Sequence, residues 1–157
     1  MIESKSLNEL NRKLAKTGEE IFKIIDSIPQ GIKKKLAIGA NDIRNTIITE
    51  MMTGPKTGKL YKKKSVTHQA SAPGQSPAVD SGELISRIIF DVRDMELEVG
   101  AEAGAPYAEF LELGTKKMKA RPWLDPAVEK HASGIFDDVG DVVVETMTAA
   151  FDKGKRS

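Results

Sequence analysis

The chain contains no cysteine and few aromatic residues, with one Trp, two Tyr and five Phe among 157 residues. Without cysteine it forms no disulfide, holds no metal through thiolates and offers no cysteine nucleophile. The small aromatic supply limits the size of the core that the chain can build alone. We therefore expect a small domain that is supported by neighbouring molecules.

Long apolar runs and an excess of one charge are also missing. No segment approaches the ~20 apolar residues of a membrane span, and the N-terminal MIESKSLNEL lacks the apolar centre of a signal peptide. We therefore expect synthesis in the cytoplasm and no membrane partner. The net charge of +1 argues against bulk polyanion binding by the whole surface, and 157 residues predict one domain, residues 1–157.

Residues 1–53 are predicted to be a helical N-terminal part. Apolar residues recur at helical spacing over Leu7–Ile28 and again over Ile32–Met51. Pro29 predicts the end of the first helix, because the residue before a proline is pushed out of the helical region. Gly54-Pro55 ends the second helix. The simplest interpretation is a pair of antiparallel helices.

Residues 54–80 differ in character, because they are rich in Gly and Pro and carry a run of basic residues without an acidic neighbour before Asp80. A loop of this length in a compact domain is usually functional or disordered. Tyr61–Thr67 also fits a strand, so the segment is either a flexible basic loop or a long hairpin arm. Its lysines are Lys56, Lys59, Lys62, Lys63 and Lys64.

Residues 81–157 predict a sheet followed by a C-terminal helix. Alternating apolar and polar residues indicate an antiparallel hairpin of Ile88–Arg93 with Glu96–Val99. An extended segment is expected over Met118–Leu124, and the last helix over Pro126 to about Phe151. The fold class is therefore α+β, with a small antiparallel sheet packed against helices, a long C-terminal helix that crosses it, and the flexible basic loop. The acidic face of the last helix comprises Glu129, Asp137, Asp138, Asp141 and Glu145.

The segment Pro106–Pro126 holds the densest set of local signals. Pro106 suits the first position of a short helix over residues 107–113, and Gly114 suits the left-handed position after it. Arg121 precedes a proline and must be extended, while Asp125 is a suitable N-cap for the last helix. These signals are typical of a docking element and contain no catalytic arrangement.

We divide this segment into two groups of residues. The structural anchors are Tyr107, Phe110, Leu111, Gly114 and Trp123. Trp123 is placed in the core, with a partner-facing hot spot as the alternative, since Trp and Arg dominate such sites. The residues offered to a subunit or partner are Glu112, Lys116, Lys117, Lys119 and Arg121, together with the five lysines of the basic segment.

No set of residues predicts catalysis. His68 and His131 have no histidine or cysteine partner at ligand spacing, and the Asp137–Asp141 carboxylates are best interpreted as a solvated helix face. Gly54–Lys59 lacks the spacing and the following Ser or Thr of a phosphate-binding loop. We therefore expect no enzyme activity, no cofactor and no metal.

Three linked motifs in the C-terminal half do indicate a family. They are Val79-Asp80-Ser81-Gly82 with Leu84; Tyr107-Ala108 with Glu112 and Gly114-Thr115; and Arg121-Pro122-Trp123-Leu124 with Pro126-Ala127. In this order they resemble the tail-completion, or head–tail joining, proteins of long-tailed bacteriophages, the gene-product-ten-like family of lambdoid phages. The first fifty or so residues carry no such signature.

The resemblance implies a structural virion protein at the phage neck, made in the host cytoplasm. Such a protein acts as a ring, a hexamer by the six-fold symmetry of the tail tube, although a neck protein can stay monomeric until its partner is present. The implied partners are connector or adaptor proteins and tail-tube or tail-terminator proteins, with DNA passing transiently through the lumen.

The basic segment leaves two further interpretations open. The lysines Lys56–Lys64 would contact phosphates in a small nucleic-acid-binding protein, although no base-reading motif accompanies them. In a ring, the basic arm of one subunit would instead lie over the acidic helix of the next, a complementarity that sets register more than affinity.

Overall fold

The computed structural model describes residues 4–103 and 105–155. It has an α+β fold, as predicted, in which helices predominate and the strands form two separate hairpins. The helices are α1 (Ser4–Asp26), α2 (Ile28–Thr53), α3 (Glu83–Ser86), α4 (Tyr107–Leu113) and α5 (Asp125–Lys155). The strands are β1 (Leu60–Lys63), β2 (Val66–Gln69), β3 (Ile88–Arg93) and β4 (Glu96–Ala101).

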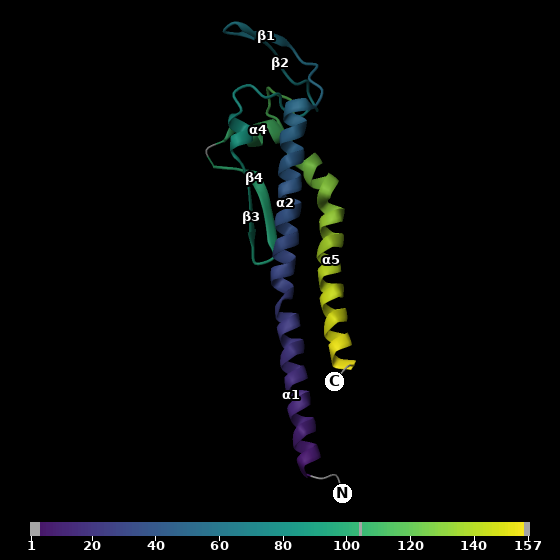
Figure 1. Ribbon diagram of the computed structural model, residues 1–157. Coiled ribbons are helices and arrows are strands. Elements are labelled where there is room, and N and C mark those ends of the chain that lie inside the picture. Colours follow the sequence, from purple (N-terminus) through teal and green to yellow (C-terminus); the bar gives the residue numbers. More distant parts are fainter. Residues whose placement is uncertain (1–3, 104, 156–157) are drawn as a thin grey trace.

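Helices α1 and α2 follow one another along nearly one line (Figure 1). Ser27, between them, keeps helical backbone angles of φ −80° and ψ −15°, and its hydroxyl donates to the Ile24 carbonyl at 2.6 Å. Pro29 falls in the first turn of α2, where a helix requires no N–H from it. The expected antiparallel pair is therefore wrong, because the proline interrupts the hydrogen bonding without reversing the chain.

Helix α2 is the centre of the molecule, with β3–β4 along one side and α5 along the other (Figure 1). Helix α5 runs antiparallel to α2 and reaches α1, where the Lys153 ammonium lies 3.1 Å from the Glu20 carboxylate. The last helix was expected to cross the sheet, but it packs along the helices, because its small and branched residues fit the glycines of α2.

Two glycines of α2 show how closely these helices approach. A Cβ added to Gly31 would lie 2.6 Å from Val142 Cγ1 of α5, and one added to Gly39 would overlap the Ile135 side chain. Each glycine lowers helix propensity by about 1 kcal/mol relative to alanine. The close packing of α5 explains why glycine occupies these two positions.

The hydrophobic core lies where α2 meets the sheet, α4 and the start of α5. Ile43, Ile47 and Met51 of α2 are the largest fully buried side chains, and they cluster with Ile88 of β3 and with Trp123. Burial of a side chain of this size contributes roughly 1.5–3 kcal/mol relative to its exposure. The core therefore fixes the sheet and the start of α5 on the C-terminal half of α2.

The expected hairpin of Ile88–Arg93 with Glu96–Val99 is confirmed, and its second strand continues to Ala101. Arg93 pairs with Glu96, and the two residues between them, Asp94 and Met95, have positive φ values of 46° and 67°. Two successive positive φ values are characteristic of a two-residue hairpin turn whose twist matches that of the strands.

The basic segment contains the second hairpin, β1–β2, so the hairpin alternative is the one found. Leu60 pairs with Gln69 and Lys63 with Val66, and the turn begins at Lys64 with φ 56°. This hairpin lies beyond the C-terminal end of α2, at the top of Figure 1.

Candidate interaction surfaces

Glu112 lies on α4 and links this helix to the start of α5. Its carboxylate accepts the backbone N–H groups of Trp123 at 2.7 Å, Leu124 at 2.9 Å and Asp125 at 3.1 Å. The first N–H groups of a helix have no partner within it, and a carboxylate there is favoured by the helix dipole. Glu112 therefore caps α5 within its own chain, a use of its side chain different from the predicted contact with a neighbour.

Trp123 and Arg121 hold the segment between α4 and α5 in place. Trp123 is 5% exposed, and its indole N–H donates to the Ala108 carbonyl at 3.0 Å. The Arg121 backbone N–H donates to the Leu111 carbonyl at 2.7 Å, and its Nε donates to the carbonyl of buried Ser71 at 3.1 Å. Arg121 thus ties the base of the basic segment to α4, and only part of its guanidinium faces outward.

Gly114 and Thr115 form a tight turn after α4. Gly114 has φ +76°, and a Cβ there would lie 2.8 Å from both the Ala120 nitrogen and the Met118 carbonyl oxygen. The Thr115 hydroxyl accepts the N–H groups of Lys117 at 3.2 Å and Met118 at 3.0 Å. No strand forms over Met118–Leu124, where an extended segment was expected: Met118, Trp123 and Leu124 are bends and residues 119–122 are irregular.

This turn carries the exposed cations of the motif segment. Lys116, Lys117 and Lys119 are exposed at its surface, as their assignment to an interface requires.

The predicted anchor residues of α4 lie on two different faces of this helix. Tyr107 and Leu111, one turn apart, are partly buried against the core. Phe110 must be removed from this group, because it is 51% exposed. It shares the outer face with Leu113, three residues on, so the sequence pattern alone did not show which apolar face of this short helix is buried.

Two lysines of the basic segment, Lys63 in the hairpin and Lys56 before it, bond to the rest of the chain. Lys63 Nζ lies 2.6 Å from the Asp80 carboxylate, a bond that raises the pKa of Lys63 and lowers that of Asp80. Lys56 Nζ donates to the last-turn carbonyl of Glu50 at 3.0 Å, and burial lowers the pKa of Lys56. These two lysines therefore serve the fold.

The remaining lysines of this segment are exposed and lie on or next to the hairpin. They are Lys59, Lys62 and Lys64. Seven of the eight strand residues are exposed, and the Tyr61 and His68 rings stack on one another with centroids 5.6 Å apart. The hairpin thus presents cations and an aromatic pair on an element with no core of its own.

Gln75 and Gly58 hold the base of this hairpin and were not singled out in the sequence. The Gln75 side-chain carbonyl accepts the N–H groups of Thr57 at 3.0 Å and Ala72 at 2.8 Å. A Cβ on Gly58 would lie 2.6 Å from the Ala70 carbonyl oxygen, which accepts the Gly58 N–H. The only sequence signals for this closure are a glycine and a single glutamine within a Pro-rich stretch.

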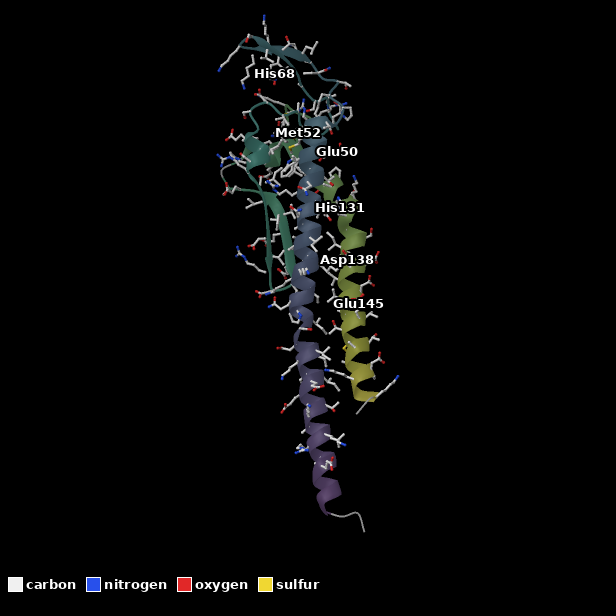
Figure 2. All side chains as sticks on the ribbon, viewed as in Figure 1. Glu50, Met52, His68, His131, Asp138 and Glu145 are labelled. Atoms are coloured by element: carbon white, nitrogen blue, oxygen red, sulfur yellow. The ribbon has the colours of Figure 1, made fainter. Side chains whose placement is uncertain are left out.

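Two of the side chains that were considered as metal ligands or catalytic groups form ordinary hydrogen bonds or ion pairs within the subunit. His131 Nε2 lies 2.8 Å from the Thr46 hydroxyl, and Asp138 pairs with Lys35 at 3.1 Å, both between α5 and α2 (Figure 2). Over residues 4–103 and 105–155, no three His, Asp or Glu side chains lie where they could share a metal ion. None of the helices in these ranges is both long and apolar enough to span a bilayer.

Comparison with known proteins identifies no relative of this chain. No family model, no curated protein and no solved structure matches it.

Proposed function

We propose that the chain is a structural subunit of a bacteriophage neck, which completes the tail and joins it to the head by forming a ring. One observation carries the proposal: residues of all three motifs that suggest the family hold the projecting hairpin or the segment that follows it. Asp80 of the first motif holds Lys63, the Gly114 turn of the second supports Ala120, and Arg121 of the third holds the Ser71 carbonyl. The Ala120 carbonyl in turn accepts the Gly74 N–H at 2.9 Å.

The motif residues therefore build a joint that holds an exposed element in a fixed place on a long helical body. The exposed hairpin has no core of its own, so its surface is available for contacts with other molecules. This arrangement suits a protein whose role is adhesion. In a ring, each subunit offers two different surfaces that match in a head-to-tail manner. We assign the hairpin and the exposed lysines of the 116–119 turn to contacts with neighbouring subunits, connector proteins and tail-tube proteins.

The proposed ring is a hexamer with a lumen through which DNA passes. The isolated chain is either ring-forming or monomeric until a neck partner binds. The host cytoplasm is the place of synthesis and the virion the final location. No catalytic step or cofactor enters this function.

Nucleic-acid binding is the second candidate, and the exposed hairpin lysines Lys59, Lys62 and Lys64 favour it. Three phosphate contacts would give a salt dependence of log K against log salt with a slope of about −2.7 on duplex DNA. A ring protein that touches DNA only in passing would show weak binding without such a slope.

Replacing Lys59–Gln69 by a two-residue turn tests the proposal, because the Gly58 N–H to Ala70 carbonyl bond closes the chain just outside the deletion. We expect the variant to keep the cooperative unfolding of the full chain and to lose ring formation, as followed by light scattering and negative-stain images. A matched variant with glutamine at Lys59, Lys62 and Lys64 separates the lysine charges from the backbone of the arm. Rings that persist after the deletion, or tight salt-dependent duplex binding by a lasting monomer, would reject the proposal.

A further inference from the structure

Helix α5 carries an apolar face that nothing in the described chain covers. Phe136 and Phe151 are 76% and 67% exposed, and Val143, Val144 and Met147 between them are also exposed. Spacings of four and three residues place these side chains on one face about 22 Å long, away from the Ile135 and Val142 face that packs on α2. A contiguous exposed apolar patch of this kind marks an interaction site.

Gly140 lies at the centre of this face and has no packing reason within the chain. A Cβ added there would meet nothing within 4 Å, whereas one added to Gly31 or Gly39 of α2 would clash with α5. The helix therefore loses propensity at Gly140 without a close contact inside the subunit. The approach of a helix from another molecule would give this glycine the role that Gly31 and Gly39 have within the subunit.

Helix α1 has a face of the same design. Leu14, Phe22 and Ile25 are exposed, with Phe22 at 74%, and Gly18 lies among them with nothing within 4 Å of an added Cβ. The helix also extends past the C-terminal end of α5 (Figure 1). A helix segment without tertiary packing is only marginally stable in water, so this part of α1 gains most from a covering partner.

Charge selects the pairing between these faces. On α5 the margin of the apolar face carries Asp137 and Asp141, and the helix as a whole holds seven acidic residues and three lysines. Two α5 helices packed on each other would bring these acidic margins together. Helix α1 as a whole carries five basic and four acidic residues, a net charge of +1, so its approach to α5 brings no such repulsion.

We propose that α1 of one copy packs lengthwise on the outer face of α5 of the next copy, with Gly18 and Gly140 at the closest approach. The inference rests on the proposed ring and names a second contact between its subunits, in addition to that of the hairpin. The two faces lie on different parts of each subunit, so the contact is head-to-tail and repeats until the ring closes. The α1 and α5 helices already pack together within the subunit through Glu20 and Lys153, so the two helices are chemically compatible.

The absence of cysteine makes site-directed cross-linking a direct test. Phe22→Cys and Val144→Cys are placed in separate full-length chains, which are mixed and treated with a short bis-maleimide. We expect a covalent dimer in the mixture and none with either variant alone. Glu145→Cys, next to Val144 on α5 but outside the apolar face, replaces Val144→Cys in the control mixture and is expected to give none.

The possible outcomes distinguish failure of the proposed contact from failure of the proposed function. A cross-link of the Val144→Cys variant with itself would replace the proposed pairing by an α5–α5 contact. Rings without the mixed cross-link would overturn the contact and leave the proposed function standing. Neither rings nor any cross-link, with and without neck partners, would overturn both.

Glycine variants give a second readout that does not depend on cross-linker reach. Gly140→Leu is expected to abolish assembly while the isolated chain stays folded, because the position is open in the subunit. Gly134→Leu changes an equally open glycine of α5 outside the apolar face and is expected to leave assembly unchanged. Equal assembly by the two variants would overturn the contact.

Discussion

Removal of the Glu112 carboxylate provides the sharpest test of the joint between α4 and α5. The Glu112→Ala change leaves three backbone N–H groups, those of Trp123, Leu124 and Asp125, without their acceptor. Loss of an N-cap acceptor costs about 1 kcal/mol and loss of the favourable charge at a helix start about 0.5 kcal/mol. The N–H of buried Trp123 adds roughly 1–2 kcal/mol, because water cannot fully replace its partner.

The expected destabilisation by Glu112→Ala is therefore about 3 kcal/mol. Glu112→Gln keeps one carbonyl oxygen but loses the charge, so it should destabilise by about half as much. Glu109→Ala is the matched control, because Glu109 is exposed on the same helix, and we expect a change within about 0.5 kcal/mol.

Urea denaturation of the three variants measures these differences from the transition midpoints. Amide hydrogen exchange at Trp123 and Leu124 reports the same bonds locally, and their protection should fall in Glu112→Ala before that of α2. The reasoning fails if Glu112→Ala and Glu109→Ala unfold at the same urea concentration.

Three further predictions concern single groups. Tyr107→Phe should keep or raise the free energy of unfolding, by up to about 1 kcal/mol, because the buried hydroxyl has no hydrogen-bond partner among the described residues; clear destabilisation would reveal a partner. Lys63 lowers the Asp80 pKa, so the stabilising effect of this ion pair on the hairpin should be fully present above the ordinary aspartate pKa. It should be lost as the pH falls through the lowered pKa. An NMR titration in which Lys63→Gln leaves the Asp80 pKa unchanged would contradict this. Gly140→Ala and Gly134→Ala should each raise the isolated chain's free energy of unfolding by about 1 kcal/mol in thermal or urea denaturation, since both positions are open; a decrease would mean that the subunit already packs there.

The sequence was sufficient where local rules decide the structure. Alternation over Ile88–Arg93 and its partner strand predicted the β3–β4 hairpin, and Gly114 predicted the end of α4, because both depend on neighbours in sequence. It was insufficient at Pro29, where a helix can either turn back or restart along the same line. The choice depends on α5, which arrives from the other end of the chain and packs on both α1 and α2.

The interaction surfaces show the same division. Exposure of Lys116, Lys117 and Lys119 follows from a polar turn, whereas the internal use of Glu112 and Arg121 depends on partners that lie many residues away. The periodicity of α5 marked its apolar residues but combined two faces, one packed on α2 and one left open. Only the position of α2 distinguishes them.

The collinear arrangement of α1 and α2 affects how the protein will behave in solution. Residues 4–53 form a nearly straight rod of about 75 Å, about twice the ~40 Å diameter of a compact domain of this length. Such a molecule tumbles and migrates like a much heavier sphere. A single subunit will therefore elute from a sizing column where a compact oligomer is expected, so only methods that measure mass directly can distinguish a lone rod from the first step of a ring.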